Sequence, residues 1–211
     1  MKRGIFVCFT GVDGSGKTTL ARHLEKHLKD SGKSCKYIWG GWRGFQSFLF
    51  KPIVSIIRRK RNSGNKPIST YSLEDNFLFD YIVWLDYSLR VFPSLFLAIR
   101  MYDLVVLDRY VYDVAVNFSL NSKKDSKKLL KNFFRIFPEP DVTFLIDVPE
   151  EIAYKRKDDI PSFEYLSIQR KYYLKLLKDH TNVKVIDGNR SKEELMYIVI
   201  KEVEGLMKCK K

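Results

Sequence analysis

Cysteine is scarce in this sequence, which has only three among its 211 residues. Cys8, Cys35 and Cys209 are far apart in the chain and odd in number. This pattern supports neither a disulfide framework nor a cysteine-rich zinc cluster. We therefore expect a protein of a reducing compartment, the cytoplasm.

Long apolar runs are lacking as well. The most apolar region, residues 77–99, is interrupted by Asp80, Asp86 and Arg90, whereas a membrane-spanning helix needs roughly 18 or more consecutive apolar residues. The short apolar run at residues 5–9 ends at polar residues and is too short for the core of a signal peptide. It predicts a strand, and we expect no membrane association.

Acidic residues are outnumbered, since 25 Asp and Glu stand against 38 Lys and Arg, for a formal net charge of +13. This balance favours an acidic partner, either a nucleotide, a nucleic acid or an anionic membrane, without choosing among them. Most basic runs are expected to be solvated faces. The length and the 45% apolar composition suit one well-buried core, so we expect a single domain over residues 1–211.

Short apolar runs alternate with longer helical patterns along the chain. This order is typical of βαβ units around a parallel sheet with helices on both faces. Ser191 followed by Glu194 has the spacing of a capping box at the start of the last helix. The sequence thus predicts a three-layer α/β fold with a five-stranded parallel sheet. The expected strands are residues 5–10, 34–39, 104–107, 142–147 and 183–186, and the expected helices are residues 17–30, part of 46–61, 73–100, 126–137, 149–157, 163–180 and 192–207.

Residues 11–18, GVDGSGKT, match the G-x-x-x-x-G-K-[ST] pattern of a phosphate-binding loop (P-loop). They lie between an apolar strand and an amphipathic helix, which is the context that the pattern requires. Gly11, Gly14 and Gly16 permit backbone conformations in which amide groups meet phosphate oxygens at close range. The dipole of the helix that follows also favours anions. The segment predicts a P-loop NTPase fold.

The loop predicts the roles of its side chains. We expect Lys17 to bridge the β- and γ-phosphates of ATP and the Thr18 hydroxyl to ligate Mg²⁺. Asp13, Ser15 and Thr19 complete the predicted nucleotide-binding set, and Thr19 is expected to act mainly as a structural residue.

A second predicted anchor lies where the apolar run 104–107 ends in Asp108 and Arg109. Ligands of open α/β sheets bind beyond the carboxyl ends of the strands, so both side chains should lie beside the phosphate loop. We expect Asp108 to hold Mg²⁺ through water and Arg109 to clamp the acceptor or the transferring phosphate. A plain ion pair at a strand end is the structural alternative.

Several of these pieces resemble the thymidylate kinase family of nucleoside monophosphate kinases. They are GVDGSGKTT at 11–19, LDRY at 107–110, PDVTFLIDVPEE at 140–151 followed by basic residues, and VIDGNRSKEEL at 185–195. They occur in the family's order, and the 140–151 segment is the most specific of them. The resemblance implies transfer of the ATP γ-phosphoryl group to a nucleoside monophosphate, most directly dTMP to dTDP, with Mg²⁺.

The resemblance also implies roles for particular residues. Asp13 looks like the family carboxylate that meets the acceptor sugar, and Arg109 looks like the arginine that holds the acceptor phosphate. Because the loop lacks the arginine that some members place near Gly14, a basic lid at about residues 155–162 is the implied substitute. Arg156 is the expected catalytic residue of this short lid, although its neighbours in Lys155-Arg156-Lys157 stay open as alternatives.

The acceptor side departs from the family pattern. The family's R-E-P-G-G is replaced at residues 39–44 by WGGWRG, in which Arg43 is the candidate phosphate clamp. The F-x-x-x-R pattern expected on the long helix is not matched, and Tyr87 is the candidate substrate-binding residue there. Asp113 stands where the family has serine, and it would repel an anionic acceptor if it faced the site.

Three functions therefore remain open. A nucleoside monophosphate kinase comes first. A kinase for a nucleoside or another small hydroxyl compound is the second, which Arg43 and Arg109 disfavour. A non-catalytic, nucleotide-dependent nucleic-acid-binding module is the third, and no recognised nucleic-acid motif supports it. The family resemblance also leaves a homodimer open.

Overall fold

The structure, a computed structural model, describes residues 3–42, 77–122, 126–157 and 162–209. The expected helix within residues 46–61, Arg43 and the middle of the expected lid lie outside this part of the chain. Among the described residues, no helix combines the length and the apolar character that crossing a membrane would take.

Five parallel strands form one sheet in the order β2-β3-β1-β4-β5. They are β1 (Ile5–Thr10), β2 (Cys35–Trp39), β3 (Leu104–Asp108), β4 (Val142–Asp147) and β5 (Val183–Asp187). β1 and β3 are buried along their whole length, as expected for strands covered on both faces. The structure confirms the predicted α/β fold, and every predicted strand is present to within one residue at each end.

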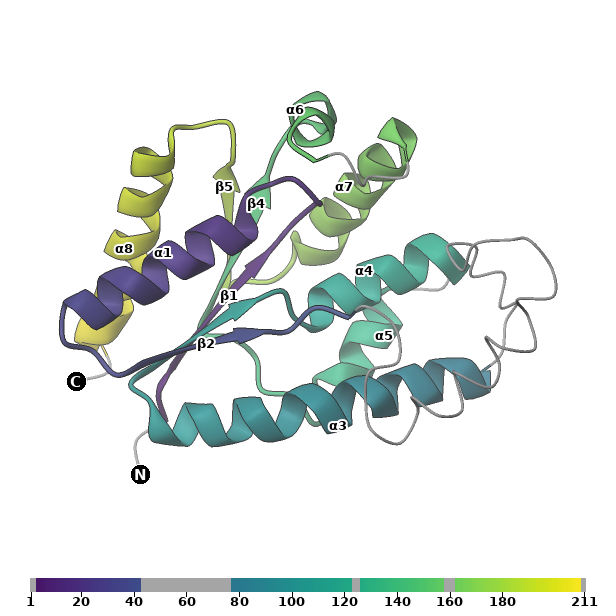
Figure 1. Cartoon of the computed structure of the whole chain (residues 1–211). Coiled ribbons are helices and arrows are strands. Elements are labelled where there is room, and N and C mark those ends of the chain that lie inside the picture. Colours follow the sequence, from purple (N-terminus) through teal and green to yellow (C-terminus); the bar gives the residue numbers. More distant parts are fainter. Residues whose placement is uncertain (1–2, 43–76, 123–125, 158–161, 210–211) are drawn as a thin grey trace, which may run out of the picture.

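Helices cover both faces of the sheet (Figure 1). One face carries α1 (Lys17–Asp30) and α8 (Lys192–Cys209), while the other carries α3 (Phe77–Met101), α4 (Val111–Ser122), α5 (Ser126–Phe133) and α7 (Phe163–Leu177), with the short α6 (Glu150–Lys155) beside β4 (Figure 1). For the helices between strands the division follows from right-handed crossovers, because the connection from β1 to β2 runs in the opposite direction to those from β2 to β3, from β3 to β4 and from β4 to β5.

Helix boundaries agree with local signals. In α1, Leu20, Ala21, Leu24 and Leu28 are buried and form one apolar stripe. The predicted capping box of α8 is confirmed, because the Glu194 amide donates to Ser191 Oγ at 3.2 Å and the Ser191 amide donates to Glu194 Oε2 at 3.0 Å.

Helix α4 is absent from the sequence-based expectation. Its residues 111–116 are all buried, so the apolar side chains show no one-sided helical period in the sequence. The omission matters because α4 follows Arg109 directly and carries Asp113 towards the phosphate loop.

Candidate active site

The phosphate loop joins β1 to α1 at the carboxyl edge of the sheet, and its glycines have conformations that other residues rarely adopt. Gly11, Gly14 and Gly16 have φ values of 138°, 82° and 90°. The loop is also pressed against its neighbours, since a Cβ atom on Gly14 would lie 2.4 Å from the carbonyl oxygen of Ala153 in α6. Backbone conformation therefore favours glycine at all three positions, and the lack of space for a Cβ atom also requires it at Gly11 and Gly14, but not at Gly16.

Lys17 lies folded over the loop that precedes it. Its ammonium group donates to the carbonyl oxygen of Val12 at 2.5 Å and to Ser15 Oγ at 3.2 Å. Burial, and then the positive charge of Arg109, lower the pKa of Lys17 to about 7, against the opposing influence of Asp13 and other carboxylates. The group best placed to meet phosphate oxygens is thus close to its titration point at neutral pH. Thr19, two residues on, lies on the exposed side of α1.

Thr18 and Asp108, the two residues expected to hold Mg²⁺, are in direct contact. The Thr18 hydroxyl donates to Asp108 Oδ2 at 2.6 Å, and the Tyr37 hydroxyl donates to the same oxygen at 2.8 Å. Asp108 Oδ1 is buried and has no hydrogen-bond partner among the described residues. Burial, and then Asp108, raise the pKa of Tyr37, so its phenol remains a donor.

A hydroxyl beside a carboxylate with one uncommitted oxygen is a donor set that suits Mg²⁺, which prefers oxygen ligands and keeps several waters. Among the described residues, no group of three or more His, Cys, Asp or Glu side chains is arranged to hold a metal by itself. A magnesium ion here would therefore be shared between Thr18, Asp108 and the phosphates of a nucleotide.

Arg109 lies directly after β3, beside the phosphate loop. Its φ of 72° is the only positive value that the described residues show outside glycine, and its amide donates to the Phe9 carbonyl at 2.9 Å, which ties it to β1. Its guanidinium group contacts Asp13 and, at 3.4 Å, Asp113. Burial opposes the charged form, but Asp113 and Asp13 raise the pKa of Arg109.

Asp113 does not point into open space. It is buried, with 1% of its surface exposed, and accepts hydrogen bonds from Thr10 Oγ1 at 2.9 Å, from the Tyr110 amide at 3.0 Å and from the Tyr173 hydroxyl at 2.8 Å. Burial raises its pKa, although Arg109 acts in the opposite direction. The repulsion of an anionic acceptor that the sequence suggested therefore does not follow from its position.

Two residues of α7 reach the site without having been predicted. Gln169 is buried; its amide oxygen accepts from the Asp13 amide at 3.4 Å, and its amide nitrogen donates to Asn117 at 3.1 Å. Tyr173 holds Asp113 from one turn further along the same helix. A polar Gln at a buried position of an otherwise amphipathic helix is the signal that could have identified this wall.

Arg156 lies at the carboxyl end of α6, where its side chain donates to the Gly188 carbonyl at 3.3 Å. It thus contacts the loop after β5 in this structure. The base of the expected lid is fixed by Arg170, which forms two hydrogen bonds to Asp147, at 2.6 and 2.9 Å, and one to Glu150 at 2.8 Å.

Tyr87 requires a correction to its predicted role. Its ring is 0% exposed and packs on Phe133 and Phe137, while its hydroxyl donates to the Gly40 carbonyl at 3.0 Å. A ligand has no ring surface to contact there, because the helix places this aromatic side chain in the core. Tyr87 instead supports the Gly40-Gly41 segment, which packs against Arg109.

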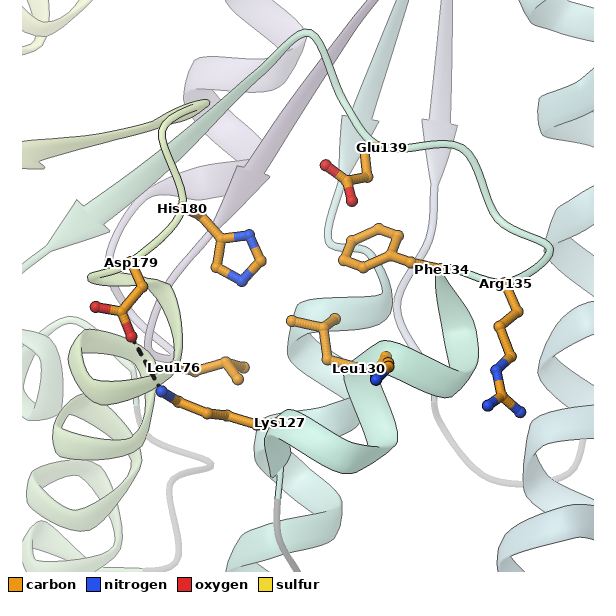
Figure 2. A pocket seen from close by; sticks show the side chains of 9 residues that line it. Lys127, Leu130, Phe134, Arg135, Glu139, Leu176, Asp179 and His180 are labelled. Carbon is orange, nitrogen blue, oxygen red and sulfur yellow. Dashed lines mark hydrogen bonds and ion pairs between the residues drawn. The ribbon is translucent and has the colours of Figure 1, made fainter.

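A cavity of about 440 Å³ lies away from the phosphate loop, between α5 and α7 (Figure 2). Apolar side chains meet an ion pair between Lys127 and Asp179 there. None of the predicted site residues that the structure describes lines it. The nine lining residues are Lys127, Leu130, Lys131, Phe134, Arg135, Glu139, Leu176, Asp179 and His180. We place the active site at the phosphate loop because Lys17, Thr18 and Asp108 lie there.

The loop lysine, the Thr18–Asp108 pair and the clamped Arg109 share one edge of a parallel sheet, which defines a P-loop kinase. The thymidylate kinase family model matches residues 93–197, and the adenylylsulphate kinase model matches residues 3–42, which include the phosphate loop.

Relatives extend the match to nearly the whole chain. A protein named probable thymidylate kinase 1, from Saccharolobus solfataricus, is 30% identical over 204 residues, which cover 94% of this chain and 96% of that protein. A probable thymidylate kinase of Archaeoglobus fulgidus is 29% identical, over 98% of both chains. A thymidylate kinase of Leptospira interrogans is 29% identical, over 92% of this chain and 91% of its own. The chain belongs to the thymidylate kinase family.

Proposed function

We propose that the protein transfers the γ-phosphoryl group of ATP to dTMP, giving dTDP and ADP. The observation that supports this most is the position of Arg109, a partly buried cation between Asp13 and Asp113 immediately beside the phosphate loop. A second cation suited to phosphate, close to Lys17 of the loop, favours an acceptor that itself carries a phosphate. The names of the relatives point to thymidylate as that acceptor.

The chain's own residues would act mainly by positioning and by charge, because phosphoryl transfer needs little covalent help. Lys17 and the loop amides would hold the donor phosphates, and Arg109 would hold the acceptor phosphate. Asp13, once its contact with Arg109 is exchanged for substrate, would meet the acceptor sugar. Bound Mg²⁺ would supply positive charge between the donor phosphates, with Thr18 and Asp108 holding it.

Arg156 is proposed as the lid cation that reaches the transferring phosphate. It is exposed and held by one hydrogen bond of 3.3 Å to Gly188, which costs little to break in water. Arg156→Met should lower kcat by about 10³-fold or more, the range of arginine fingers, whereas Lys155→Met, its exposed neighbour, should leave kcat nearly unchanged. Equal kcat for Arg156→Met and wild type would remove Arg156 from the mechanism.

A homodimer is proposed as the assembly. On α3, Leu89, Phe96, Leu97 and Met101 are between 44% and 62% exposed, and apolar side chains gathered on one helix suit a self-complementary interface. Light scattering on the purified protein should give twice the chain mass, and Leu97→Glu should return the single mass.

An acceptor panel tests the proposed function. Purified protein with ATP and Mg²⁺ is given dTMP, other nucleoside monophosphates or thymidine, and ADP release is measured. We expect the highest kcat/KM with dTMP and none with thymidine. Turnover with thymidine alone would overturn the proposal in favour of a nucleoside kinase.

Matched variants connect the activity to the site. Lys17→Ala should reduce turnover by about 10²-fold or more, as removal of a single donor to developing charge does in other enzymes. Lys29→Ala, an exposed lysine of the same helix, should turn over at the wild-type rate. If no acceptor releases ADP and salt-sensitive binding to RNA or DNA is found instead, the chain is a nucleic-acid-binding module.

A further inference from the structure

Asp108 is held by two hydroxyl groups on the same oxygen. Thr18 and Tyr37 both donate to Oδ2, at 2.6 and 2.8 Å. The other oxygen, Oδ1, is buried without a hydrogen-bond partner among the described residues. The carboxylate is therefore fixed at one oxygen while the second stays uncommitted.

Strand register explains how Tyr37 reaches this carboxylate. Tyr37 pairs with Val106 and Trp39 pairs with Asp108, so Tyr37 and Asp108 are diagonal neighbours on one face of the sheet. That face is the one covered by α1, which carries Thr18 at its start (Figure 1).

Arg22 holds the ring of Tyr37 from the helix side. Its guanidinium carbon lies 3.4 Å from the ring centroid, in the range of a cation–π contact. Arg22 follows Thr18 by one helical turn, so the same helix supplies the hydroxyl on Asp108 and the cation on the ring. Tyr37 is thereby held between the sheet and α1 with its hydroxyl aimed at Asp108.

We propose that Tyr37 is a positioning residue for the magnesium site, which acts by holding Asp108 so that Oδ1 faces the metal. The proposal rests on the metal site of the proposed function. Thr18 must share its hydroxyl between the metal and Asp108, whereas the single hydrogen of the Tyr37 hydroxyl is donated to Asp108 and Tyr37 is not a ligand of the proposed metal. Tyr37 therefore restrains the carboxylate independently of the metal.

The test measures metal affinity rather than turnover. ADP binding is followed by calorimetry in EDTA and at increasing Mg²⁺, for wild type, Tyr37→Phe and Tyr197→Phe. The control loses the same hydroxyl from a tyrosine on α8 that is 67% exposed. We expect Tyr37→Phe to raise the Mg²⁺ concentration for half-maximal effect about tenfold, equivalent to about 1.4 kcal/mol, and to leave ADP affinity in EDTA within about twofold of wild type.

Other outcomes would overturn the role. An unchanged Mg²⁺ requirement in Tyr37→Phe means that the hydroxyl does not position Asp108. Equal loss of ADP affinity with and without Mg²⁺ means that the hydroxyl supports the loop as a whole. Arg22→Met, which removes the cation from the ring, should raise the Mg²⁺ requirement by a smaller factor, about threefold. A larger effect than that of Tyr37→Phe would contradict the proposal that Arg22 acts on Asp108 through Tyr37.

Failure of the proposed dTMP kinase function can be distinguished from failure of the Tyr37 proposal. Because ADP and Mg²⁺ are the only ligands, the assay reports on Tyr37 even if dTMP is not the acceptor. Wild-type protein that binds ADP with Mg²⁺ but does not phosphorylate dTMP would refute the proposed acceptor and leave the role of Tyr37 intact.

Discussion

Nucleotide binding should draw a proton from solution onto Lys17. In the nucleotide-free protein, burial and Arg109 lower the pKa of Lys17 to about 7, so at pH 8 only about one tenth of the molecules carry the charged form. Negative phosphates beside the amine favour the charged form and raise its pKa. Binding at pH 8 should therefore take up about 0.9 proton, and at pH 7 about 0.5.

Calorimetry in buffers of different ionisation enthalpy measures this uptake directly. A non-hydrolysable ATP analogue with Mg²⁺ is titrated into the protein at pH 7 and 8, and the slope of observed enthalpy against buffer enthalpy gives the protons bound. Lys29→Met is the matched control, because Lys29 is exposed and its contact with Glu25 raises its pKa. Uptake near zero at pH 8 in the wild type would refute the reasoning, since Lys17 would then be charged before the nucleotide arrives.

The same shift has a consequence for stability. The pKa of Lys17 falls from 10.5 to about 7 on folding, so between these values the unfolded chain binds more protons than the folded chain. The contribution of Lys17 to the unfolding free energy must then rise with pH across this window. Lys17→Met lacks this contribution, and urea unfolding between about pH 7 and pH 10 should show a smaller rise for the variant than for wild type.

Three further predictions concern the surrounding residues. Gly14→Ala should abolish nucleotide binding and lower Tm, because its Cβ would lie 2.4 Å from the backbone of α6. The Cβ of Gly16→Ala would meet nothing within 4 Å, so this variant should lose only the stability that a left-handed backbone costs alanine, about 1–2 kcal/mol by urea unfolding. Arg109→Ala should raise the KM for dTMP far more than the KM for ATP in steady-state kinetics, and equal effects would discredit its acceptor role. Arg170→Met should lower the unfolding free energy by about 1–2 kcal/mol, since it loses three charge-assisted hydrogen bonds to Asp147 and Glu150; an unchanged Tm would show that these ion pairs contribute nothing.

The sheet could be predicted from sequence because buried parallel strands read as continuous apolar runs. β1 and β4 are predicted with the bounds that the structure shows. Helix α1 is predicted equally well, since its apolar stripe has the helical period and follows a glycine-rich loop. Helix α4 could not be found in this way, because burial on all sides removes the contrast between faces on which the period depends.

In the candidate site, the residues of one local motif could be predicted from sequence, whereas contacts between residues far apart in the chain could not. Lys17, Thr18 and the loop glycines belong to one contiguous motif, so their spacing alone predicts them. Tyr37 reaches Asp108 across 71 positions and Gln169 reaches Asp13 across 156, and no local pattern encodes such contacts. Tyr87 shows the converse error, because an aromatic residue at helical spacing is as consistent with the core as with a ligand surface.

The two carboxylates on Arg109 differ in a way that suits an exchangeable acceptor. Asp113 is buried and held by three other donors, so it is a permanent partner that fixes the guanidinium group from within. Asp13 has 27% of its side chain exposed, and its pKa is lowered below the ordinary value because Arg109 and Lys17 outweigh the burial that would raise it. An incoming phosphate can replace Asp13 on Arg109 without leaving a buried charge alone, whereas loss of Asp113 would leave the partly buried arginine without its inner partner. If Arg109 holds the acceptor phosphate, as proposed, Asp113 would orient this arginine and Asp13 would be the contact that substrate displaces.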